Sequence, residues 1–79
     1  MSILPMISSR ALLRVLLKAG FKIVRQGGSH IRLQHFRDVT RQTTIPYHNA
    51  DIPRWLLNEI LKQAKFSVKE FLKLLKRTR

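Results

Sequence analysis

The stretch "VRQGGSHIRLQH", residues 24–35, decides how the middle of this chain folds. Two strand-like segments flank a Gly27-Gly28 pair, and we expect this pair to form a two-residue hairpin loop because glycine tolerates positive φ. Side chains alternate between the two faces of a strand, so Ile31 and Leu33 share one face. Because that apolar face is expected to be buried, three polar side chains are left on the open face of the strand: His30, Arg32 and Gln34.

The segments around this hairpin complete the sheet and open the chain with a helix. Strands are predicted over residues 21–26, 29–35 and 41–47, joined by short turns into an antiparallel meander. A helix is predicted before them over residues 9–19, since apolar residues recur there at helical spacing. Ser8 or Ser9 is the expected N-cap of this helix, and Gly20 is the residue expected to end it.

Two further helices are predicted after the strands. Asp51 is the expected N-cap of the first, with Pro53 tolerated in its first turn and Trp55 assigned to its core-facing side. Ser67 and Glu70 have the Ser-x-x-Glu spacing of a capping box, which predicts that the last helix begins there.

The predicted order α-β-β-β-α-α describes a single α+β domain over residues 1–79. One face of a three-stranded antiparallel sheet has to be covered, and the helices are the cover that this chain supplies. We therefore expect the helices on one face of the sheet. The other face stays open to water or to a partner.

Charge is the strongest global signal in the sequence. Sixteen Lys and Arg residues stand against four Asp and Glu residues, which gives a formal net charge of +12. A domain this basic is typical of proteins that bind a polyanion, and nucleic acid is the partner we expect first. Every fourth residue of the first helix is basic, which indicates either a solvated face or a row of phosphate contacts. The candidate RNA contacts are Arg10, Arg14, Lys18, Arg25, Arg32 and Gln34.

Several classes of protein are excluded by composition. The chain has no cysteine, so a disulfide framework and a thiolate metal site are ruled out. No apolar stretch reaches the roughly 20 residues that a membrane-spanning helix needs, and the N-terminal stretch lacks the pattern of a signal peptide. We therefore expect a cytoplasmic protein. The four carboxylates are scattered, which leaves no pair with the spacing of a two-metal nuclease site and no expected metal or cofactor.

Histidine is the residue type left for chemistry. If this chain cuts a phosphodiester without a metal, the substrate is RNA, because the 2′-OH is a built-in nucleophile that needs only a base, an acid and cations. His30 on the open face is the main candidate for acid or base, although an exposed histidine beside a turn is also compatible with a solvated residue. His48, in the loop after the last strand, is a candidate second acid/base group. His35 falls on the buried side and is expected to be structural.

Three stretches occur in a distinctive order. "SSRALLRVLLKAGFKIVRQGGSHIRLQH" contains the expected first helix, the first strand and Gly-Ser-His; "TTIPYH" has the pattern Thr-hydrophobic-Pro-x-His at a strand end; and "LLNEILKQAKFSVKEFLKLL" covers the last two helices. In this order they resemble the corresponding segments of the HicA-type toxins, which are small mRNA interferases of type II toxin–antitoxin systems.

The resemblance implies a fold like the double-stranded-RNA-binding domain, cleavage of mRNA, and neutralisation by a HicB-type antitoxin through which any oligomer forms. It implies that His30 is catalytic and that Gly28 and Ser29 are motif positions, the glycine for backbone shape. His48 matches a position of the family's motif, but the resemblance assigns no role to this residue. The residues alone leave two alternatives open: a non-catalytic double-stranded RNA-binding module, and a basic ribosome-associated protein.

Overall fold

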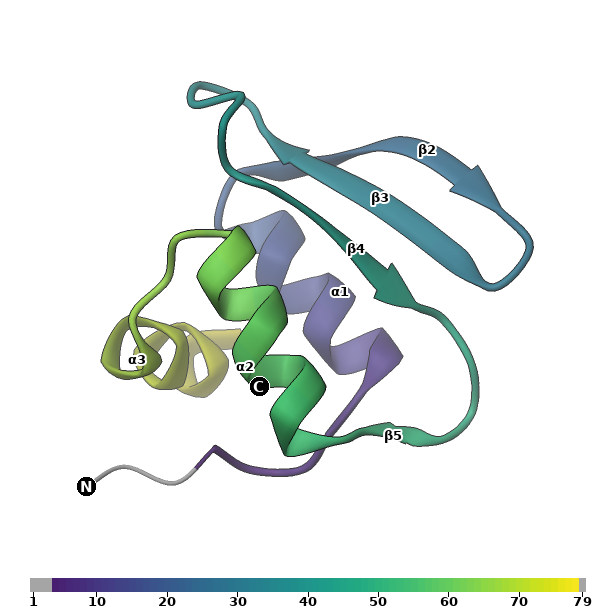
Figure 1. The fold of residues 1–79 in the computed structure, drawn as a ribbon. Helices are drawn as coiled ribbons and strands as arrows, with labels where there is room; N and C mark the ends of the chain where they lie inside the picture. The colour runs from purple at the N-terminus through teal and green to yellow at the C-terminus, as the bar shows by residue number, and fades with distance from the viewer. Residues whose placement is uncertain (1–3, 79) are drawn as a thin grey trace.

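A computed structural model gives the fold of this protein and describes residues 4–78. The elements in chain order are β1 (Ile7–Ser8), α1 (Ser9–Lys18), β2 (Phe21–Gly27), β3 (His30–His35), β4 (Gln42–Pro46), β5 (Asp51–Ile52), α2 (Arg54–Gln63) and α3 (Val68–Thr78). Strands β2, β3 and β4 form an antiparallel sheet with β3 in the centre, and α1 and α2 lie against one of its faces (Figure 1). The predicted α+β class and the helices on one face of the sheet are confirmed.

Helix α1 begins and ends at the residues expected from the sequence. The Ser8 hydroxyl accepts a hydrogen bond of 3.1 Å from the backbone N–H of Ala11, which makes Ser8 the N-cap. Gly20 follows the helix with φ of +99°, in the left-handed region that favours glycine. The glycine therefore ends the helix and lets β2 begin at the next residue, Phe21.

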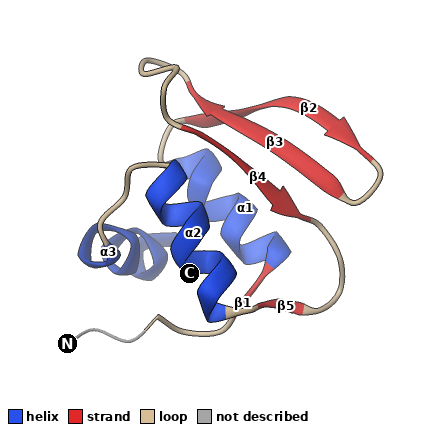
Figure 2. Cartoon of the chain, in the orientation of Figure 1, coloured by secondary structure: helices blue, strands red, loops and turns tan. Residues whose placement is uncertain are grey.

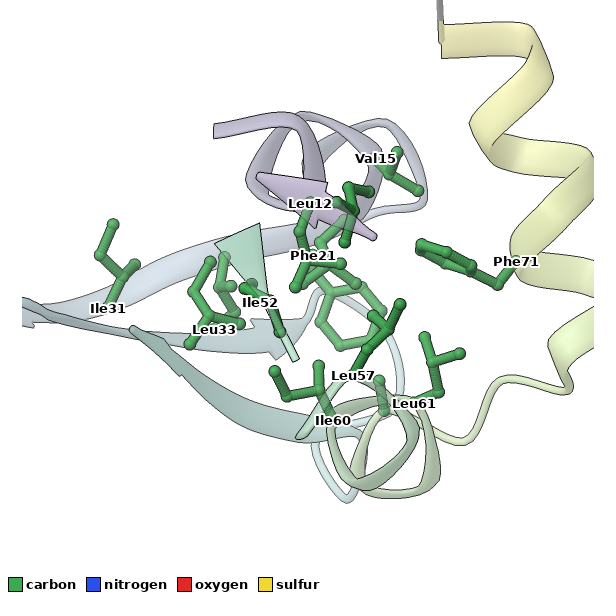
Figure 3. Close-up of a cluster of buried hydrophobic side chains, with 14 of the residues drawn as sticks. Leu12, Val15, Phe21, Ile31, Leu33, Ile52, Leu57, Ile60, Leu61 and Phe71 are labelled. Carbon is green, nitrogen blue, oxygen red and sulfur yellow. The ribbon is translucent and has the colours of Figure 1, made fainter. Parts of the chain in front are cut away.

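The capping box of α3 is also confirmed. The backbone N–H of Glu70 donates to the Ser67 hydroxyl at 3.1 Å, and the N–H of Ser67 donates to the Glu70 carboxylate at 3.2 Å. Phe71, in the first turn, is fully buried. Figure 3 shows this ring projecting from α3 toward the side chains of α1 and α2, so the box fixes the start of the helix that closes the core.

The prediction that Asp51 caps α2 is wrong. Asp51 lies in β5 opposite Ser8, and the N-cap position is held by Pro53, which offers no side-chain hydrogen bond. The physical reason is Ile52, which precedes a proline and is therefore confined to extended backbone. This residue is buried opposite Ile7, and the resulting β1–β5 pair was not predicted.

Trp55 was assigned to the core, and this assignment is also wrong. Its side chain is 69% exposed. Helix α2 buries a narrow stripe made of Leu57, Ile60, Leu61 and Ala64. With 3.6 residues per turn, Trp55 falls on the opposite side of the helix from that stripe.

The core lies between the sheet and the helices. Ile31 and Leu33 of the central strand are 2% and 0% exposed, so the face predicted to be buried is confirmed. Figure 3 shows both among the apolar side chains that meet between the elements. The buried apolar residues contributed by α1 and its neighbouring strand are Leu12, Val15, Leu16 and Phe21.

His35 is structural, as its place in the alternation indicated. Its ring packs edge-on against Phe21, with centroids 5.3 Å apart. Its Nδ1 accepts hydrogen bonds from the backbone N–H groups of Arg37 and Asp38, at 3.1 and 3.2 Å. The imidazole therefore shapes the β3–β4 turn, away from the open face of the sheet.

Gly20 provides a test of this packing. Gly20→Ala is expected to lower the free energy of unfolding by about 1–3 kcal/mol, because left-handed backbone is unfavourable for alanine and the new methyl group would crowd its neighbours. An added Cβ would lie 3.0 Å from the Phe36 ring and 3.1 Å from Nε2 of His35. Urea unfolding measures the effect.

Gly27→Ala is the matched control, since an added Cβ there meets no heavy atom within 4 Å. Its free energy of unfolding is expected to stay near that of the natural chain. Equal stabilities of the two variants would contradict the close packing at Gly20.

Candidate active site on the open sheet face

The β2–β3 hairpin differs by one residue from the prediction. Gly27 pairs with His30 as the last rung of the ladder, so the two-residue loop is Gly28-Ser29 and not Gly27-Gly28. Gly28 has φ of +57°, which is the positive value expected of a hairpin glycine. His30 therefore lies directly beside the turn, as the first residue of β3.

The ladder gathers polar residues of three strands on the open face. His30 and Arg32 are exposed and Gln34 is half-buried, in agreement with the expected alternation. Residues directly opposite each other in a ladder share a face. The cross-strand partners of these three residues are Gly27, Arg25 and Lys22 on β2, and Pro46, Thr44 and Gln42 on β4.

A β-bulge places Arg25 on this face. The β2–β3 register shifts between Ile23 and Arg25, so that Val24 is an extra residue without a partner. Strict alternation would put Arg25 on the same face as Ile23, which pairs with the buried Leu33. Because the bulge inserts one residue, Arg25 turns to the open face, directly opposite Arg32.

Two arginines and the histidine border one shallow hollow. Its volume is about 260 Å³, and its lining is made of Arg25, Gly27, His30, Arg32 and Thr44. Nothing larger than hydrogen projects from Gly27, so the backbone beside His30 stays accessible. A phosphate placed here would meet two guanidinium groups and an imidazole, which is a chemically suitable site for an anion.

Arg32 is held in place by the neighbouring strand. Its guanidinium donates to the Thr44 hydroxyl at 3.4 Å and also to the Gln42 side-chain oxygen. The sequence analysis did not identify Thr44 and Gln42 as partners of Arg32. Alternation along β4 is the signal that could have done so: Thr43 and Ile45 are buried, so Thr44 and Gln42 have to lie on the open face. Arg32 is therefore oriented before any ligand arrives.

His48 lies near the same end of the sheet. The N–H of Tyr47 donates to the carbonyl of Ser29 at 2.6 Å, which joins the loop after β4 to the hairpin turn. Nδ1 of His48 accepts a hydrogen bond of 3.2 Å from the N–H of Ala50. Nδ1 of His48 thus binds the backbone, which leaves Nε2 as the ring nitrogen for a substrate.

The two histidines are close enough to act on one RNA segment. His30 pairs with Pro46, and His48 follows two residues later. Opposed Cα atoms lie about 5 Å apart and two residues add at most about 7.6 Å, so the Cα atoms of His30 and His48 are within about 13 Å. Their side chains line different hollows, so a substrate that meets both has to extend from one hollow to the other.

The basic stripe on α1 is exposed along its length, but it does not face His30 as a unit. Arg10 lines a hollow together with Tyr47 and His48. Arg14 instead lies beside α3, in a hollow with Leu75 and Thr78. Helical rise separates Arg10 from Lys18 by about 12 Å along the axis, so only the Arg10 end of the stripe lies near the candidate site.

The carboxylates of the described chain lie apart and have other partners. Hydrogen bonds from the Thr40 hydroxyl and N–H lower the pKa of the Asp38 carboxyl, and Glu70 belongs to the capping box. Within residues 4–78, no three His, Asp or Glu side chains come together as a metal-binding group. In the same range, no helix has the length and apolar character needed to cross a membrane.

A comparison with models of known protein families gives a match. A family model described as the HicA toxin of bacterial toxin–antitoxin matches residues 9–66, a segment that contains all the candidate site residues. No curated protein matches the chain.

The opposed arginines predict a measurable repulsion. Arg25→Gln is expected to raise the free energy of unfolding by roughly 0.2–1 kcal/mol at low salt, because like charges directly opposite each other destabilise an antiparallel pair. The gain should shrink as salt is added, since ions screen exposed charges. Urea unfolding at two salt concentrations measures both effects.

Lys22→Gln is the matched control on the same strand and face, because Lys22 lies opposite the neutral Gln34. We expect a smaller change for this variant. The same stabilisation in both variants, or one that does not depend on salt, would contradict a specific repulsion between Arg25 and Arg32.

Proposed function

Because the chain belongs to the HicA toxin family of bacterial toxin–antitoxin systems, we propose that it is an endoribonuclease that cuts mRNA without a metal ion. One observation carries this proposal: His30 is exposed beside a hollow that it shares with Arg25 and Arg32. An acid or base and two phosphate-binding cations are the groups that cleavage by the 2′-OH requires. The toxin acts in the cytoplasm, where mRNA is translated.

The reaction is a transfer of phosphorus from one RNA oxygen to another. A base removes the proton of the 2′-OH, and the 2′-oxygen then forms a bond to the adjacent phosphorus. The bond from phosphorus to the 5′-oxygen of the next nucleotide breaks, and an acid gives that oxygen a proton. Negative charge builds on the phosphoryl oxygens in between, where cations lower the barrier most effectively.

We assign one role to each group. His30 shares a hollow with the two arginines, and we propose it as the base that takes the 2′-OH proton. Arg25 and Arg32 bind the phosphate, and Arg32 is already oriented by Thr44 and Gln42. His48 is the proposed acid: its imidazolium form gives a proton to the leaving 5′-oxygen and becomes neutral imidazole.

A HicB-type antitoxin is the proposed partner. It binds the open face of the sheet and covers His30, and its contacting surface is acidic because this chain carries a net charge of +12. Complementary charge speeds such an encounter and fixes the orientation of the partners. Hydrogen exchange of the complex tests this arrangement: slower exchange at the β2–β3 turn supports it, and slower exchange confined to α3 would contradict it.

The cleavage activity can be tested on purified protein. His30→Ala is expected to lower the rate of RNA cleavage in EDTA by about 10²–10⁴-fold, which is the usual contribution of general acid–base catalysis. The fold should be unaffected because the side chain is exposed. Lys73→Ala, an exposed change on the far helix α3, is the control and should cleave at the natural rate.

Three results would contradict the proposal. Cleavage at equal rates by His30→Ala and the natural chain would remove His30 from the chemistry. RNA binding with no cleavage by the natural chain would favour the alternative, a non-catalytic RNA-binding module. Cleavage that stops in EDTA and returns with Mg²⁺ would refute the metal-independent mechanism.

A further inference from the structure

A second hollow contains His48, the proposed acid, but its other lining residues have no role in the chemistry described above. Its volume is about 440 Å³, within the range typical of small-ligand sites. The lining comes from two parts of the chain, the start of α1 and the loop after β4. The lining residues are Ser8, Arg10, Tyr47, His48 and Asn49.

The walls of this hollow are fixed at both ends. Tyr47 is hydrogen-bonded to Ser29 of the hairpin turn, and the loop ends at Asp51, which pairs with Ser8. Figure 2 shows the loop leaving β4 and reaching β5 beside β1. The β1–β5 pair, which also buries Ile7 and Ile52, thus holds the start of α1 against the loop.

The side chains offer the separate chemistries that one nucleotide needs. Arg10 supplies a cation for a phosphate, and the Tyr47 ring, 38% exposed, supplies an aromatic surface on which a base can stack. The Asn49 amide both donates and accepts hydrogen bonds, as the edge of an unpaired base requires. We propose that this hollow binds one nucleotide of single-stranded RNA.

The place of His48 fixes which nucleotide this is, and this step rests on the proposed function. His48 lines the hollow and is the acid that protonates the leaving 5′-oxygen. That oxygen belongs to the nucleotide on the 3′ side of the bond that is cut. The hollow therefore binds the 3′ nucleotide, and Tyr47 and Asn49 determine the base preferred there.

Binding is tested first, independently of cleavage. The probes are hexaribonucleotides that differ in one central base, added to the ¹⁵N-labelled His30→Ala chain and followed by NMR. We expect shifts of the backbone amides of residues 47–50, with at least a threefold weaker affinity after Tyr47→Ala. Lys69→Ala on α3 is the control and should bind with unchanged affinity.

Shifts confined to the open sheet face, with none at residues 47–50, would overturn the nucleotide site. So would an affinity that Tyr47→Ala leaves unchanged. Thermal unfolding of each variant shows whether it retains the fold. Lost affinity in a folded Tyr47→Ala chain supports the site.

The 3′ assignment is tested by sequencing the ends that the natural chain and Asn49→Ala produce from RNA of random sequence. We expect Asn49→Ala to weaken the base preference on the 3′ side of the cut severalfold and to leave the 5′ side unchanged. An unchanged 3′ preference would overturn the assignment. The two proposals can fail separately. If RNA shifts the amide signals of residues 47–50 but the natural chain cuts no RNA, the proposed function is contradicted and the nucleotide site is still supported.

Discussion

The burial of Ile31 and Leu33 on the central strand is the constraint on which the candidate site depends. Both side chains are buried against the helices, and β3 is paired on both edges, so its register is fixed from two sides. A slip of one residue would expose both aliphatic side chains, each worth about 1.5–3 kcal/mol when buried, and would bury His30 and Arg32 instead. The same hydrophobic energy that folds the domain therefore holds the imidazole and the guanidinium toward the open face.

The open face itself is arranged for an anion at some cost to stability. The bulge at Val24 turns Arg25 toward Arg32, although two like charges opposite each other repel. Thr44 and Gln42 orient Arg32 without neutralising it, since neither carries a charge. A phosphate or an acidic partner relieves this repulsion when it binds. Both proposed ligands, RNA and the antitoxin, supply negative charge at this place.

The spacing of apolar residues, every second residue in strands and every three to four in helices, predicted most of the fold. In so small a domain, few arrangements of the helices and strands bury all these residues. The face of Ile31 and the capping box at Ser67 were both read correctly from local sequence. The errors arose where tertiary contacts decide. Asp51 lies in a strand because the next residue, Ile52, is buried against Ile7. Trp55 is exposed because the buried stripe of α2 is narrower than the run of apolar residues around Trp55 suggested. The bulge that redirects Arg25 and the hollow around His48 depend on pairing between distant segments, which leaves no periodic signal in the sequence.

The chemical ends of the cleaved RNA give the most direct test of the central claim, which is that the 2′-OH of the substrate, and not water, attacks the phosphorus. Attack by the 2′-oxygen leaves a 2′,3′-cyclic phosphate on one fragment and a 5′-OH on the other. Mass spectrometry of a short RNA cut by the purified chain in EDTA distinguishes these ends from a 3′-OH and a 5′-phosphate. We predict the cyclic phosphate and the 5′-OH, and no cleavage when the nucleotide before the cut is 2′-deoxy. A 5′-phosphate, or cleavage of the deoxy substrate, would show that water and not the 2′-OH attacks, and would contradict the account.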